Sequence, residues 1–538
     1  MKSQIFTIIL LLSIPVTVNA KLRSTASLDT SYINNEVQGD DFGKRDSSSL
    51  VIQPTVGLIL ESEIIDASFN VDHRFIRDSS SIENSEDIGT NDKSSLTNYS
   101  YRVKVNTIQD ILSLNASGSQ TYRNVDVTNV LINNEDFGNK QLAKTRTDAV
   151  GFDLTLNKSK LMGFEMSGNT TSVNSDESSF LENGLDSTND TLGAVFYSGP
   201  SLKAISWNFV GNYNKTQGRG SNDIESRTFN GNVYLGLFSN LRLVTTAQLE
   251  NNILTSTQDA EGTQELEYNS YGAGLSWYRS AEQFIDITYN ESSKQEGEKE
   301  HFIGTNFSWR FSPRTKISGE YGRRFYGESG RFSLNYDLRK LRIEASYTEE
   351  VTSFTRLIAG DTVGGIFVCP IGSVSFFECF IPESLDYDLQ PGEEFTALNI
   401  NLAELSEEST LRKSFQLSAG YNFRRFSAAF TLVSSDFEYV QTLRKQQELN
   451  SSFTLNVNLS KLATLSWTNT YGKAKRNISE LSEGLDDRTI SSTLTYRHSL
   501  SRNADIYFSY QITNRASPVE NRDFISRRST VRYSYKFK

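Results

Sequence analysis

The stretch RFSLNYDLRKLRIEASYT (331–348) decides the fold, because its side chains alternate between apolar and polar on both sides of a break near residue 339. A side-chain period of two is that of a β-strand with one apolar and one polar face. FTLNVNL (453–459) and ADIYFSYQIT (504–513) repeat the pattern. No comparably long segment shows an apolar stripe at helical spacing. The chain is therefore predicted to be all-β.

The spacing of the breaks predicts how the strands are arranged. Short breaks fall near residues 61, 107, 159, 200, 239, 281, 312, 339, 425, 460 and 500. Longer charged or Asn/Ser/Gly-rich segments lie between the resulting hairpins, at 76–93, 124–141, 174–188 and 356–409. This layout is typical of a single transmembrane antiparallel up-and-down β-barrel with short periplasmic turns and long extracellular loops. With one further strand at each end, we expect about 24 strands, within a range of about 22–26.

The N-terminus predicts export. MKSQIFTIILLLSIPVTVNA (1–20) has Lys2, an apolar stretch and small residues at Val18 and Ala20. This is the pattern of a secretory signal peptide, and it assigns residues 21–538 to the barrel. After residue 20 no apolar run approaches the ~20 residues of a membrane-spanning helix. A soluble exported protein remains an alternative, but the breaks favour a barrel in the outer membrane of a Gram-negative bacterium.

Composition argues against several functions. The formal charge of −11 and the sequence pI near 5.1 argue against a nucleic-acid partner. The three histidines and two cysteines leave little material for catalysis or metal binding, and no histidine lies in a catalytic or metal-binding motif. We therefore expect no enzyme, no cofactor and no metal. His498 with Ser499 or Ser501 is the one local candidate for a barrel enzyme acting on lipid or protein.

The polar face of the strands should line the lumen, because Arg or Lys facing lipid at mid-membrane costs ~2–4 kcal/mol. These charges either pair across strands or set the field of a conduit, and the sequence leaves both open. Residues 411–538 carry ten more basic than acidic side chains, so one arc of the wall is expected to be basic. The side chains expected to point inward are Arg102, Lys104, Arg242, Arg310, Lys316, Glu320, Arg324, Arg331, Asp337, Arg342, Glu344, Arg497, Arg528 and Arg532.

The long segment 356–409 holds both cysteines. Export sends them to an oxidising compartment, which predicts a Cys369–Cys379 disulfide. The bridged segment is unusually apolar for a loop, so we expect a stapled hairpin that narrows the pore mouth, docks a partner, or only packs on itself.

The end of the chain, STVRYSYKFK (529–538), places Tyr533, Tyr535 and Phe537 on one face. It resembles the C-terminal strand signal that the barrel assembly machinery recognises, with Lys538 as a departure from the usual terminal aromatic residue.

Three segments together resemble the outer-membrane β-barrels associated with PEP-CTERM and exopolysaccharide loci: VIQPTVGLILESEIIDASFNVDHRF (51–75), NTIQDILSLNASGSQTYRN (106–124) and NRDFISRRSTVRYSYKF (521–537). The resemblance implies contact with outer-membrane lipid, polysaccharide-export components as partners, and a part in secretion or assembly of extracellular polysaccharide. It brings no catalytic residues. A passive conduit or assembly component is thus the leading prediction, and a general porin or small-solute channel is the main alternative.

Overall fold

The computed structural model describes residues 20–39, 43–82, 91–108, 111–124, 142–157, 159–176, 185–202, 204–218, 223–255, 263–294, 299–352, 367–370, 393–396, 410–439, 444–478, 485–518 and 523–537. Apart from Ala20, the predicted signal peptide lies outside these residues. Within them, no helix is long and apolar enough to cross a membrane.

Alternating side chains fold into long strands, as the period of two requires. In chain order the strands are β1 (Lys21–Gly39), β2 (Gly43–Glu61), β3 (Ile65–Ile82), β4 (Asn91–Ile108), β5 (Leu112–Asn124), β6 (Leu142–Leu156), β7 (Met162–Ser175), β8 (Leu185–Ser198), β9 (Ile205–Gly218), β10 (Asp223–Gly236), β11 (Leu241–Thr255), β12 (Thr263–Ser280), β13 (Gln283–Lys294), β14 (Lys299–Ser312), β15 (Thr315–Arg324), β16 (Gly327–Leu338), β17 (Leu341–Thr352), β18 (Phe367–Pro370), β19 (Glu393–Thr396), β20 (Thr410–Phe423), β21 (Phe426–Tyr439), β22 (Lys445–Asn458), β23 (Ala463–Ile478), β24 (Leu485–Ser499), β25 (Ala504–Ala516) and β26 (Phe524–Phe537).

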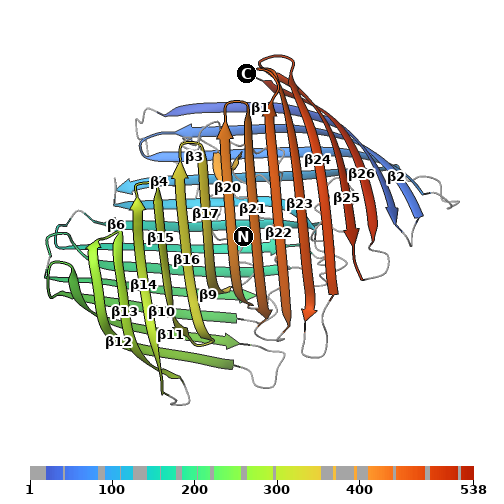
Figure 1. Cartoon of the computed structure of the whole chain (residues 1–538). Coiled ribbons are helices and arrows are strands. Elements are labelled where there is room, and N and C mark those ends of the chain that lie inside the picture. The colour runs from blue at the N-terminus through green and yellow to red at the C-terminus, as the bar shows by residue number, and fades with distance from the viewer. Residues whose placement is uncertain are drawn as a thin grey trace.

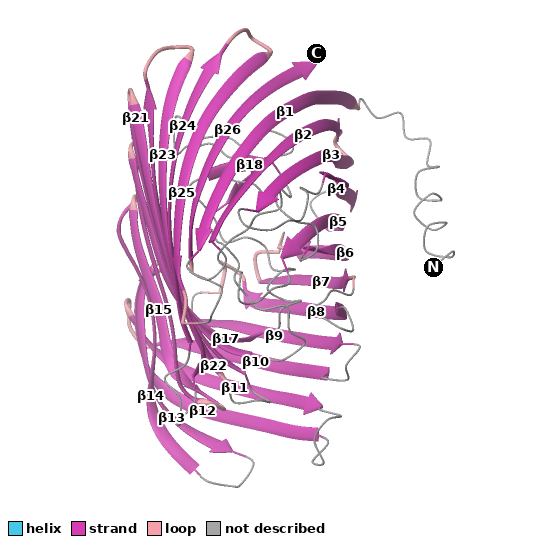
Figure 2. Cartoon of the chain, turned by 90° about the vertical axis from the view of Figure 1, so that its right-hand side faces the viewer, coloured by secondary structure: helices cyan, strands magenta, loops and turns pink. Residues whose placement is uncertain are grey.

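The main sheet has 24 strands and closes on itself (Figures 1 and 2). Each of its strands pairs antiparallel with the next one along the chain, and β17 pairs with β20. The last strand, β26, pairs with β1 from Ala26↔Phe537 to Gln38↔Ile525, so the first and last strands leave no free edge. The all-β class, the antiparallel closed barrel and the strand count are therefore confirmed.

One end of the barrel carries the tight turns, and each predicted short break falls at a junction there. At the opposite end the strands extend further than predicted. β3 and β4 take up much of the segment 76–93, because the backbone ladders continue to Arg45↔Ile82 and Ser79↔Asn91. β15 and β16 are joined by only Phe325 and Tyr326, and Gly327 adopts a φ of +115°, which favours glycine. Within 356–409, β18 pairs with β19 in a separate two-stranded sheet.

Contacts that skip strands identify the inner face of the wall. The Tyr234 hydroxyl on β10 donates to Asp286 on β13 at 3.0 Å, and Arg324 on β15 reaches Glu250 on β11 at 2.6 Å. Side chains three or four strands apart can meet in this way only on the concave side of a curved sheet.

The opposite face of the same strands carries large exposed apolar residues. Ile287 and Ile303 are 54% and 59% exposed, and Ile490 on β24 is 55% exposed. An apolar surface of this extent requires a covering other than water.

Candidate functional site

The candidate site is the inner wall of the barrel. By strand register, the fourteen charged residues expected to point inward all lie on the same face as Glu250 and Asp286. For example, Arg331 pairs with Glu320, and Arg528 pairs with Asn35. A one-residue slip would reverse this placement, so register fixes it. Their part in selecting a solute stays a prediction.

Arginines cluster with an aromatic ring where the barrel closes. Arg497 on β24 and Arg532 on β26 lie over the ring of Tyr507, at 5.7 and 5.6 Å from its centroid. Arg497 donates to Asp505 at 2.9 Å, and Arg532 pairs with Asp29 of β1 at 3.1 Å. The Arg497 side chain is 48% exposed, so its guanidinium is accessible from the lumen while Asp505 holds it in place.

Other predicted cations are also held by a partner. The Arg242 guanidinium stacks 3.1 Å from the centroid of the Tyr278 ring, and Arg342 donates to Asp337 at 3.1 Å. Arg310 forms an ion pair with Glu282 in a tight turn. Pairing across and beside strands thus accounts for much of the inward charge. It favours the interpretation that these charges pair with one another over the interpretation that they set the field of a conduit.

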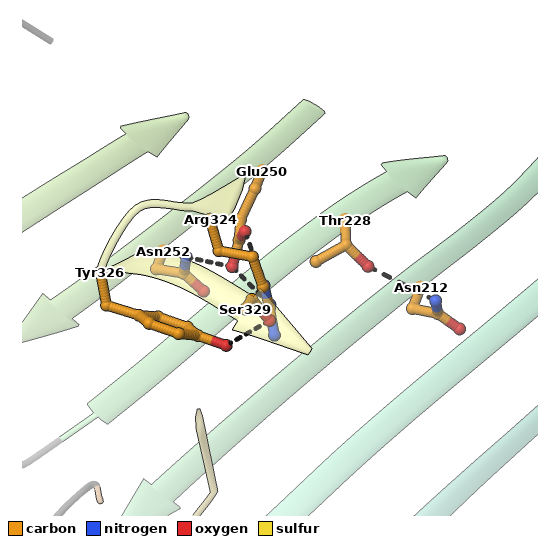
Figure 3. Close-up of polar contacts among 7 residues, drawn as sticks. All are labelled: Asn212, Thr228, Glu250, Asn252, Arg324, Tyr326 and Ser329. Carbon is orange, nitrogen blue, oxygen red and sulfur yellow. Dashed lines mark hydrogen bonds and ion pairs between the residues drawn. The ribbon is translucent and has the colours of Figure 1, made fainter. Parts of the chain in front are cut away.

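The wall turns a corner between β10 and β15, where Arg324 of β15 lies over Glu250 of β11 (Figure 3). Glu250 accepts from Arg324 through both oxygens, at 2.6 and 3.1 Å, and from the Asn252 amide at 3.0 Å. Thr246 donates to Asn290 at 2.9 Å. Glu250, Asn252 and Asn290 are each no more than 3% exposed. This part of the inner wall is therefore a packed polar corner rather than an open surface.

A glycine makes the corner possible. A Cβ on Gly272 would lie 1.8 Å from the Asn290 side-chain oxygen, a distance that no heavy-atom contact tolerates. Only glycine at position 272 leaves room for the Asn290 side chain to lie over the backbone of β12.

The inner face from β5 to β10 has a different character, because Asn, Ser and Thr dominate it. Asn212 and Thr228 face each other and are joined by a 3.4 Å hydrogen bond (Figure 3). Asn208 pairs with Asn232 in the register of the same two strands. Other members on these strands are Ser113, Asn115, Ser117, Thr147, Ser167, Asn169, Thr191, Ser206, Asn214, Ser226 and Asn230. We call this surface the neutral wall. It offers amide and hydroxyl groups, both donors and acceptors, with little charge.

Sequence reasoning missed the acidic partners Asp29, Glu250, Asp286 and Asp505. Alternation alone could have placed them inward. The cation that each of these carboxylates contacts depends on the curvature of the closed sheet, and no local sequence pattern indicates this curvature.

The three histidines lie on the outward face. His498 contacts the Tyr496 hydroxyl at 3.3 Å, whereas Ser499 points inward and donates to Asp505 at 2.6 Å. Strand alternation separates His498 from Ser499, which removes this pair as a catalytic candidate. His73 and His301 share the outward face with Thr97 and Tyr289.

The remaining predicted residues are only partly described. Cys369 lies in β18 and pairs through its backbone with Glu394. Cys379 and the side chains of this segment lie outside the described residues, so the disulfide stays a prediction. Tyr533, Tyr535 and Phe537 lie on the outward face of β26, with Tyr533 and Phe537 exposed. Their role in assembly is likewise untested.

No family model matches the chain, and no curated protein matches it. Among solved structures it is similar to the FrpB iron transporter of Neisseria meningitidis, at 10% identity and a TM-score of 0.44, covering 96% of this chain and 81% of that one. The siderophore receptor PirA of Pseudomonas aeruginosa matches at 8% identity and 0.37, covering 96% and 80%. OccK9 of Pseudomonas aeruginosa matches at 8% and 0.32, covering 96% and 98%. Likeness of this degree does not indicate what this chain carries.

Proposed function

We propose that this chain is an outer-membrane conduit, or a component of an assembly, through which extracellular polysaccharide is exported. The observation that carries the proposal is the neutral wall on β5–β10, set on the concave side of a closed barrel whose convex side is apolar. In lipid, backbone polar groups are satisfied only by helices and closed barrels, so closure and an apolar exterior support a membrane location.

The chemistry of the neutral wall suits a sugar polymer. Sugar hydroxyls both donate and accept hydrogen bonds, as do amides and hydroxyls such as Asn212 and Thr228. Each exchange of a water hydrogen bond for one to the wall gains only about 0.5–1.5 kcal/mol. A surface of many weak contacts lets a polymer enter without being trapped, which conduction requires. The exposed guanidinium of Arg497 adds a donor for acidic sugar groups near the β1–β26 closure.

Deleting the gene should abolish or sharply reduce polysaccharide secretion while synthesis inside the cell continues. In planar bilayers, added polysaccharide should block the ion current of the purified barrel, and replacing Asn208, Asn212 and Asn230 by Leu should weaken the block. Normal secretion in the deletion strain, with a steady current that polysaccharide leaves unchanged, would instead establish the small-solute channel.

The small-solute channel is the second candidate, and one observation favours it. The packed corner at β10–β15 and the paired arginines give a fixed inner wall that needs no partner to be complete. A porin of this kind should conduct ions steadily without any other protein.

A further inference from the structure

A cluster of cations lies on the outward face of β23 and β24, at the end of the barrel opposite the tight turns. Lys473 and Arg488 face each other across the two strands and share one carboxylate, Asp486, at 3.3 and 2.9 Å. Lys475 stands opposite Asp486 in the same ladder. We call Lys473, Lys475, Asp486 and Arg488 the outward basic cluster.

Among the described residues, the outward basic cluster holds three cations and one carboxylate, and the carboxylate contacts Lys473 and Arg488. Arg488 is 57% exposed at its side chain. Two other outward ion pairs at this end, Arg227–Glu225 and Lys299–Glu291, each join one cation to one carboxylate. Among the described residues, the outward faces of the two flanking strands, β22 and β25, carry no acidic side chain.

The depth of the cluster matches a lipid headgroup. Below Arg488 on the same face of β24 come Ile490 and Leu494, and Leu500 follows at the tight turn; all three are exposed. Ten residues separate Ile490 from Leu500, which is about 23 Å along the barrel axis at 3.3 Å per residue and a tilt of about 45°. The apolar band of a membrane barrel is about 25 Å tall, so Arg488 stands just above it.

We propose that the outward basic cluster binds a phosphate group on the headgroup of a lipid in the outer leaflet, with the acyl chains lying on Ile490 and Leu494. This inference rests on the proposed membrane location. The Arg488 guanidinium can hold two phosphate oxygens at once, while Lys473 and Lys475 supply compact charge beside it. The apolar surface directly below the cations favours a lipid over free phosphate.

The test uses the purified full-length barrel in detergent, with bisphosphorylated lipid A and the same lipid A without phosphates as probes. Native mass spectrometry counts the lipid retained. We expect Lys473→Gln/Arg488→Gln to weaken retention of the phosphorylated lipid by about 30-fold. Arg227→Gln, on the same face, is the matched control and should change retention little. Inorganic phosphate at the lipid concentration should not displace the lipid.

Any of the following outcomes would overturn the proposal: unchanged retention in the double variant, equal retention of the lipid without phosphates, or an equal loss in Arg227→Gln. Displacement by equimolar inorganic phosphate would show a site for free phosphate, and it would also overturn the lipid assignment. Polysaccharide secretion by the double variant is scored separately. If the lipid test fails but secretion still requires the wild-type barrel, the proposed function stands and only the lipid site is wrong. If the double variant loses lipid binding but secretes normally, lipid binding is not needed for secretion.

Discussion

At the scale of single residues, the Glu250–Arg324 ion pair joins a buried carboxylate to a guanidinium from a distant strand. The Glu250 side chain is 1% exposed, so Arg324→Gln would leave its carboxylate buried without a counter-charge. Breaking a buried pair in this way destabilises a protein by about 3–5 kcal/mol. Urea unfolding of the refolded barrel should show this loss, and Arg324→Gln/Glu250→Gln should recover part of it. Arg227→Gln breaks an exposed pair and should cost less than about 1 kcal/mol. Equal losses in both single variants would mean that burial does not govern the pair.

Gly272 offers a second test at this scale. Gly272→Ala places a methyl group where Asn290 crosses β12, so Asn290 must move and the corner loosens. We expect a loss of about 1–3 kcal/mol, as for other overpacked sites. Gly211→Ala is the matched control, because no heavy atom lies within 4 Å of its Cβ position. Unfolding midpoints that shift equally in the two variants would contradict the packing argument.

At the scale of the strand, two residues adjacent in sequence should respond differently to the same substitution, because one faces lipid and the other faces the lumen. Leu494 is 46% exposed on the outward face of β24, and Thr493 points inward. Leu494→Arg should cost about 2–4 kcal/mol of folding free energy in lipid, because it places a cation in the apolar band. Thr493→Arg should fold normally. The yield of folded barrel in lipid vesicles measures both, and the reverse order would invert the assigned faces.

Strand facing could be predicted from sequence because it depends on a local period of two, which Arg331 and Leu334 already display. The tight turns could be predicted for the same reason, since a turn interrupts that period. The Arg324–Glu250 pair could not be predicted, because 74 residues and three intervening strands separate its members. Its formation depends on how sharply the whole sheet bends between β10 and β15. The strand ends in 76–93 were missed because charged residues suggested a loop where the ladder in fact continues.

At the scale of the whole molecule, stability depends on closure between β1 and β26. This ladder runs from Ala26↔Phe537 to Gln38↔Ile525 and is reinforced inside by Arg532–Asp29. A closed barrel satisfies every strand edge, so the folded chain should resist detergent until boiled and should change its mobility on gels when heated.

Removing 524–537 would expose the edges of β1 and β25, and the heat-dependent shift should disappear after refolding from urea into detergent. Refolding without cellular factors separates closure from recognition by the assembly machinery. As the control, Tyr533→Ala/Tyr535→Ala/Phe537→Ala keeps the backbone ladder and should retain the shift in detergent. If the truncated chain stays heat-modifiable while this triple variant does not, the aromatic side chains and not the closing ladder hold the barrel together.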